Sequence, residues 1–88
     1  MEPSGQRRPE RLYERVVSTR RNCRFEDLER LLLACGFVAG KASGSHVTFR
    51  RPAAADRPVQ RVTVPKQRPV NIHYIDEVLA LIGDRPPG

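Results

Sequence analysis

The chain has 88 residues, two of them cysteines, and a formal net charge of +6 at neutral pH. This length suffices for one small domain and excludes a second, and no apolar run approaches the length that crosses a membrane. No apolar stretch of the kind a signal peptide needs follows the N-terminal residues MEPSGQRRPER, so we expect a cytoplasmic protein. Cys23 and Cys35 fit no metal spacing, and in a reducing compartment we expect two structural thiols.

Two helices are predicted in the first part of the chain. In RPERLYERVVS, Pro9 suits a helix start, and Leu12 and Val16 fall on one side of a short amphipathic helix. This helix would belong to an N-terminal extension, residues 1–21. In RFEDLERLLLACGF, apolar residues recur at helical spacing, acids occupy the first turn, and Gly36 follows as a C-terminal cap.

After Gly36 the apolar period changes to two, which is typical of strands. We predict a strand at 37–41, a turn at ASGS and a second strand at 46–51. A loop rich in Pro and Ala then leads to a third strand, VQRVTVP, which Pro65 ends. The apolar spacing of NIHYIDEVLALIG predicts a closing helix, and the tail, residues 84–88, is expected to be disordered.

These elements predict an α+β fold of two layers, in which a three-stranded antiparallel sheet carries the helices on one face. The other face of the sheet, called the open face below, would be exposed to solvent. Strand alternation places polar and basic side chains there, while a shift of one residue in register would turn them into the core. The predicted members are His46, Thr48, Arg50, Arg61 and Thr63.

The positive charge is concentrated in the middle of the chain. Residues 41–68 contain one acid, Asp56, against seven basic residues. Such a field attracts a polyanion, and the forked guanidinium of arginine suits contacts to phosphate. The seven basic residues are Lys41, Arg50, Arg51, Arg57, Arg61, Lys66 and Arg68.

His46 is the strongest candidate for chemistry, because an imidazole can gain or lose a proton near neutral pH. RNA cleavage without a metal needs a base for the ribose 2′-hydroxyl, an acid for the departing oxygen, and cations at the phosphate. His46 can serve one proton transfer, with Lys41, Arg50 or Arg61 as the cation. The residues alone leave the alternative open that His46 is an exposed turn residue. His73, at the start of the last helix, is expected to be a surface or capping residue.

The run FEDLERLLLACGFVAGKASGSHVTFRRP, followed by VTVP and YIDEVLALI, resembles the HicA toxins of bacterial toxin–antitoxin modules. The resemblance covers roughly residues 22–83, and its most specific parts are Leu-Leu-x-x-x-Gly-Phe at 31–37, Gly-Ser-His at 44–46, Phe49, and Val-Pro at 64–65. It implies a fold similar to a double-stranded RNA-binding domain, the activity of a ribosome-independent mRNA interferase, and catalysis by His46. It also implies a HicB-like antitoxin that covers this histidine. Promoter DNA would then be contacted only indirectly, through the antitoxin.

Many members of the family carry further histidines at two places where this chain has none. Val47 stands at the first place and Lys66-Gln67-Arg68 at the second. We therefore keep two alternatives: a noncatalytic RNA-binding module of the same fold, and a partner-binding remnant of a toxin. No metal or cofactor is expected. The complete predicted site consists of catalytic His46 with Lys41, Ser43, Ser45, Thr48, Arg50, Arg61 and Lys66 as RNA-binding residues.

Overall fold

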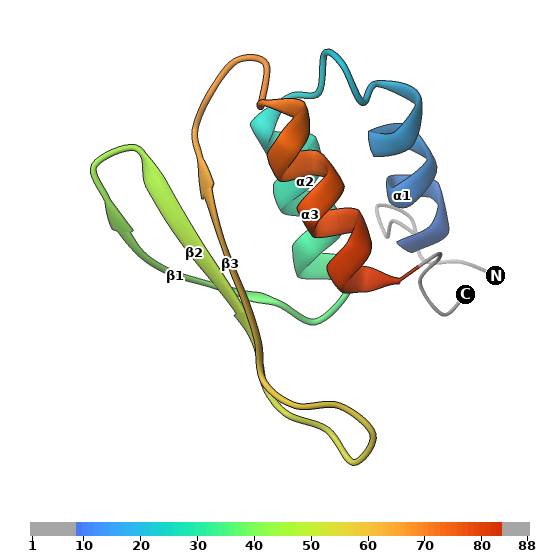
Figure 1. Ribbon diagram of the computed structural model, residues 1–88, viewed down its shortest axis with the longest axis vertical. Coiled ribbons are helices and arrows are strands. Elements are labelled where there is room, and N and C mark those ends of the chain that lie inside the picture. The colour runs from blue at the N-terminus through green and yellow to red at the C-terminus, as the bar shows by residue number, and fades with distance from the viewer. Residues whose placement is uncertain (1–8, 84–88) are drawn as a thin grey trace, which may run out of the picture.

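The computed structural model describes residues 9–83, which form three helices and one three-stranded antiparallel sheet (Figure 1). Helices α2 and α3 cover one face of the sheet, and α1 packs against α2 on the side away from the strands (Figure 1). The predicted α+β fold, including the additional N-terminal helix, is confirmed. In chain order the elements are α1 (Pro9–Ser18), α2 (Phe25–Ala34), β1 (Val38–Ser43), β2 (His46–Arg51), β3 (Gln60–Pro65) and α3 (Ile72–Ile82).

The end of α2 turns the chain toward the sheet through its glycine cap. Gly36 has a φ of 96°, which glycine adopts without a steric penalty. Its N–H donates to the carbonyl of Leu33 at 3.1 Å, and the N–H of Phe37 donates to the carbonyl of Leu32 at 3.0 Å. These are the two bonds of a Schellman cap, so the predicted C-terminal role of Gly36 is confirmed.

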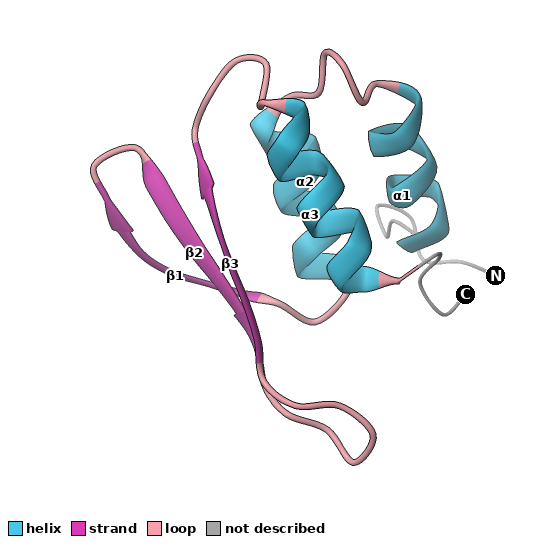
Figure 2. Ribbon diagram, viewed as in Figure 1, coloured by secondary structure: helices cyan, strands magenta, loops and turns pink. Residues whose placement is uncertain are grey.

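Strand β2 lies in the centre of the sheet and pairs with both neighbours. Val47 lies opposite Val64, Phe49 lies opposite Val62, and all four side chains are buried under the helices. The predicted register is therefore the observed one, since a shift by one residue would have buried the polar set instead. The connection between β2 and β3, residues 52–59, extends beyond the sheet and away from the helices (Figure 2).

Strand β1 differs from its prediction in length and in regularity. It runs from Val38 to Ser43 rather than over 37–41, and it contains a β-bulge. Ala39 pairs with Phe49 and Ala42 with Val47, so two residues of β1 lie opposite Thr48 alone. The first of these is a glycine, Gly40, where a Cβ would lie 3.1 Å from the carbonyl oxygen of Thr48.

The hydrophobic core lies between the sheet and the helices, and α1 contributes to it. Cys23 is buried and Cys35 half-buried; both are free, and burial raises the pKa of both thiols. Within residues 9–83 no helix has the length and apolarity needed to cross a bilayer. The tail predicted to be disordered, 84–88, lies outside the described residues. The core comprises Leu12, Val16, Cys23, Phe25, Leu28, Leu31, Leu32, Phe37, Val47, Phe49, Val62, Val64, Val70, Ile75 and Val78.

Candidate functional site

The open face is ordered by cross-strand pairing into three rows. Residues directly opposite each other in an antiparallel sheet share a face, so the register assigns each position. The row at one end contains the predicted histidine, and the row at the other end contains two arginines. The rows are Ser43, His46 and Pro65; then Gly40 and Lys41 of the bulge with Thr48 and Thr63; then Val38, Arg50 and Arg61.

His46 is the first residue of β2, and its side chain is exposed. Ser43 lies beside it on β1, and Pro65 lies beside it on β3. In the part of the chain that the structure describes, no side chain hydrogen bonds to the imidazole. The imidazole is thus available to a ligand on the open face.

The turn before His46 fixes where the imidazole enters the sheet. Two residues, Gly44 and Ser45, connect β1 to β2, and of these only Gly44 has a positive φ, at 62°. This pattern is that of a type II′ hairpin, whose twist matches that of the paired strands. The carbonyl of Ser45 accepts a hydrogen bond of 2.6 Å from the backbone N–H of Lys66, which joins the turn to the end of β3.

The middle row is held together by a hydrogen bond between two threonines. The hydroxyl oxygens of Thr48 and Thr63 lie 2.9 Å apart across β2 and β3. Thr48, a predicted RNA-binding residue, therefore has one hydroxyl bond within the protein. Each hydroxyl has further bonding capacity and can still contact a ligand.

The cations on the open face have no carboxylate on the strands to balance them. Arg50 lies directly opposite Arg61, and Lys41 occupies the neighbouring row in the bulge. Strands β1, β2 and β3 contain no Asp or Glu. Like charges placed directly opposite each other destabilise a sheet, and a bound anion would offset that repulsion.

The structure does not bring Lys66 onto the open face with the other predicted residues. Its ammonium lies 5.9 Å from the centroid of the Phe25 ring, at the start of α2. There it lines a pocket of about 290 Å³ together with Glu26 and Glu29. The physical reason is that β3 ends at Pro65, so the alternation of the strand no longer governs the next side chain.

Arg51 is a further basic residue that points away from the open face. Its guanidinium lies 4.7 Å from the centroid of the Phe37 ring, and its Nη1 donates to the carbonyl of Cys35 at 2.9 Å. Alternation along β2 indicates this direction, because Val47 and Phe49 also point inward. Only part of the positive charge of residues 41–68 is therefore available to a ligand on the open face.

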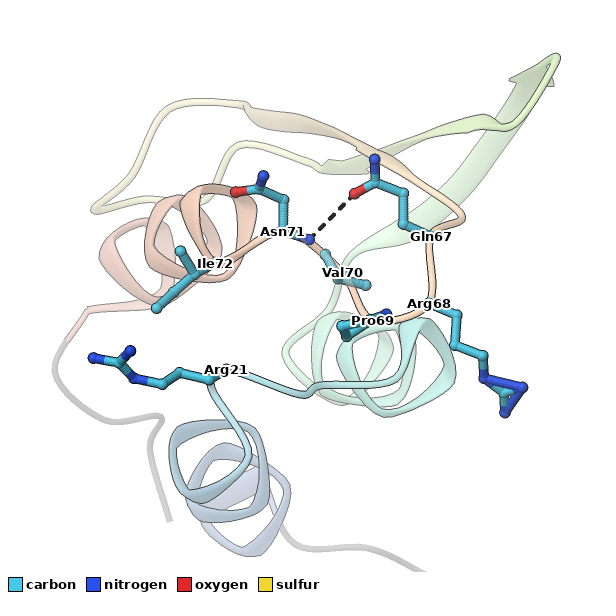
Figure 3. A pocket seen from close by; sticks show the side chains of 7 residues that line it. All are labelled: Arg21, Gln67, Arg68, Pro69, Val70, Asn71 and Ile72. Carbon is cyan, nitrogen blue, oxygen red and sulfur yellow. Dashed lines mark hydrogen bonds between the residues drawn. The ribbon is translucent and has the colours of Figure 1, made fainter.

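A further pocket lies at the start of α3, and the sequence did not predict it. It has a volume of about 710 Å³ and contains Arg21 and Arg68 among its lining residues (Figure 3). Arg21 reaches toward Ile72, whereas Arg68 extends away from it, so the two guanidinium groups do not converge (Figure 3). The side chain of Asn71 caps the helix by accepting from the backbone N–H of His73 at 2.8 Å, and His73 is exposed, as expected for a surface residue.

We assign the candidate site to the open face rather than to this pocket, because a polyanion binds to an exposed basic surface and needs no enclosed cavity. Among residues 9–83, no three His, Cys, Asp or Glu side chains lie together in a way that could hold a metal ion. Comparison with protein-family models found no matching family, and comparisons with curated proteins and with solved structures found no match either.

Proposed function

We propose that the open face binds RNA and that His46 transfers a proton in the metal-independent cleavage of mRNA, as the toxin of a type II toxin–antitoxin pair. One observation carries the proposal: an exposed imidazole shares a face with Lys41, Arg50 and Arg61, on strands that contain no acid. The resemblance of residues 22–83 to HicA toxins supports the same activity.

The reaction that suits this face is an internal transesterification of RNA. The 2′-oxygen of a ribose attacks the neighbouring phosphorus and loses its proton to a base, while the bond from phosphorus to the 5′-oxygen breaks and that oxygen takes up a proton. His46 acts as the base, or as the acid in its protonated form, and a proton exchanged with water completes the balance. A cation beside the phosphate stabilises the added negative charge of the transition state.

RNA rather than DNA is the proposed substrate because the ribose supplies the nucleophile. The protein then needs only to bind phosphate, orient the strand and move protons. The open face provides these functions with side chains that are exposed in the free chain. In the proposed pair, a HicB-like antitoxin inhibits the toxin by covering His46, and promoter DNA is contacted only through that antitoxin.

The proposal is tested by RNA cleavage with the purified protein and its His46→Ala variant, each with and without EDTA. We expect His46→Ala to lower the rate by about 10²-fold to 10⁴-fold and EDTA to have no effect. His73→Ala is the matched control, since it removes the other histidine of the chain from α3, and it should cleave at the wild-type rate. Equal rates for His46→Ala and wild type would exclude His46 as the proton-transfer group.

A second candidate function is RNA binding without cleavage. It is favoured by the observation that, in the described part of the chain, His46 is the only histidine on the open face, because His73 belongs to α3. One of the two proton transfers of the cleavage reaction would then need a group other than histidine. This function predicts RNA binding that weakens with added salt and leaves the RNA intact.

A further inference from the structure

The histidine and the arginine pair of the open face lie two rows apart, at opposite ends of this face. His46 and Arg50 are four residues apart on β2, which corresponds to about 13 Å along the strand. Side chains stand roughly perpendicular to a sheet, so the imidazole and the guanidinium retain most of that separation. Arg61, opposite Arg50, lies at the same distance from the row of His46.

Lys41 is the cation nearest to His46 in the grid of the open face. The bulge sets Lys41 opposite Thr48, one row from His46, at a spacing of about 7 Å along the strand. Its long flexible stem allows the ammonium to reach a phosphate that the imidazole contacts. A bulge is a common device for redirecting a side chain next to a functional site.

Apart from the imidazole of His46, the open face has no aromatic ring on which a base could stack. Apart from histidine, the aromatic residues of this chain lie in the core or pack against it. Proteins that bind single strands through their bases generally use exposed aromatic rings as stacking platforms. Because this face has three cations and only one small ring, we expect most of its contacts to be directed to the phosphates. Phe25, Phe37 and Phe49 belong to the core, and Tyr13 and Tyr74 pack against it.

We infer that the open face holds RNA at two separate phosphate subsites. His46 and Lys41 form the reaction subsite, and Arg50 with Arg61 forms an anchoring subsite about 13 Å away. The inference rests on the proposed function and specifies its substrate class: RNA strands long enough to reach both subsites, recognised through the backbone with little dependence on base sequence. Lys41 is then the group that stabilises charge in the reaction, a role the arginines do not share.

The test compares a ribodinucleotide, which has one phosphate between its nucleosides, with a long oligoribonucleotide of mixed sequence. The double variant Arg50→Ala/Arg61→Ala should lower kcat/KM for the long RNA by about tenfold or more and leave the dinucleotide unaffected. Lys41→Ala should lower kcat/KM for both substrates by the same factor. Arg11→Ala, which removes an exposed arginine from α1, is the matched control and should leave both unchanged.

Two kinetic results would overturn the inference. An equal loss on both substrates in the double variant would mean that the arginines act at the reacting phosphate. An unchanged rate on the long RNA would mean that they anchor nothing. Thermal unfolding of each variant establishes that the fold is retained, as expected for exposed positions.

Equilibrium binding to 2′-O-methyl RNA, which cannot be cleaved by this route, tests the two subsites independently of catalysis. It therefore distinguishes a failure of the proposed catalysis from a failure of the subsite inference. If the wild-type protein cleaves no RNA, the double variant should still bind a long strand more weakly than wild type does. The slope of log K against log salt should also become shallower, by about 0.7 for each phosphate that the variant no longer neutralises. An unchanged affinity and slope would exclude the anchoring subsite. A preference of more than about tenfold between strands of different base sequence would exclude backbone recognition.

Discussion

Arg51 donates from both Nε and Nη2 to Oε1 of Gln60, the residue directly opposite it on β3. The amide nitrogen of Gln60 in turn donates to the carbonyl of Leu81 at 3.1 Å, and Nη1 of Arg51 donates to the carbonyl of Cys35. The guanidinium thereby links β2 and β3 to the end of α2, and Gln60 extends the link to the end of α3. Its ring contact with Phe37 adds a cation–π interaction beneath the sheet.

Replacing Arg51 should destabilise the fold far more than replacing its neighbour. Arg51→Ala removes a charged donor and leaves the oxygen of Gln60 without its partner, which should lower the free energy of unfolding by about 2–3 kcal/mol. Arg50→Ala, one residue earlier on the exposed side, should change it by less than about 0.5 kcal/mol. Urea unfolding measures both. Equal losses would contradict the structural role of Arg51.

Gly44 should be sensitive to substitution although its surroundings are open. No atom lies within 4 Å of a Cβ built there, so Gly44→Ala tests the positive φ alone. A residue other than glycine in this region costs about 1–2 kcal/mol. We expect this loss in urea unfolding and no loss for Ser45→Ala, the control in the same turn. Full stability of Gly44→Ala would show that the hairpin does not need this conformation.

The ion pair between Arg20 and Asp76 should make stability depend on pH. Nε and Nη2 of Arg20 lie 2.7 and 2.8 Å from the two carboxylate oxygens of Asp76, which joins the segment after α1 to α3. The hydrogen bonds from this guanidinium lower the pKa of Asp76 below its usual value.

Because the pKa of Asp76 is lower in the folded than in the unfolded state, its contribution is present above the unfolded value of about 4 and is lost as the pH falls through the folded value. Asp76→Asn should thus be less stable than wild type near neutral pH and equally stable in strong acid. Glu77→Gln is the control on the same helix. A deficit of Asp76→Asn that persists in strong acid would contradict the ion pair as its source.

The two adjacent valines of α1 should differ strongly in how much a charged substitution destabilises the fold. Val16 is fully buried, whereas Val17 is 43% exposed. Val16→Asp would place an unpaired carboxylate in the core and should abolish the cooperative unfolding transition, while Val17→Asp should shift it little. Circular dichroism during thermal unfolding measures both. Tolerance of Val16→Asp would mean that α1 is dispensable for the fold.

The orientation of the site could be predicted from sequence because it depends on strand alternation. Once Val47 and Phe49 are assigned to the core, His46 and Arg50 must face the other way, and the structure has them there. The same reasoning holds for Arg61, which is adjacent to buried Val62. The alternation of apolar and polar residues is a local property, so a short stretch of sequence is enough to indicate which side chains of a strand are buried.

Other features could not be predicted, because they depend on contacts between distant parts of the chain. Arg20 and Asp76 are 56 residues apart, so no local pattern indicates that they form an ion pair. Lys66 is predicted to bind RNA together with residues of the open face, but the strand ends before it and its ammonium lies against the ring of Phe25. The bulge that positions Lys41 depends on close approach of two backbones, for which one glycine is an insufficient signal.

That bulge also affects how the chain behaves toward copies of itself. β1 is an edge strand whose six residues are all exposed, and a regular edge of this kind would offer free N–H and C=O groups to a strand of another molecule. The extra residue between Ala39 and Ala42 interrupts the repeat of those groups, and the charge of Lys41 lies at the interruption. The same irregularity that brings a cation toward the histidine therefore makes this edge of the sheet a poorer template for a strand of another molecule.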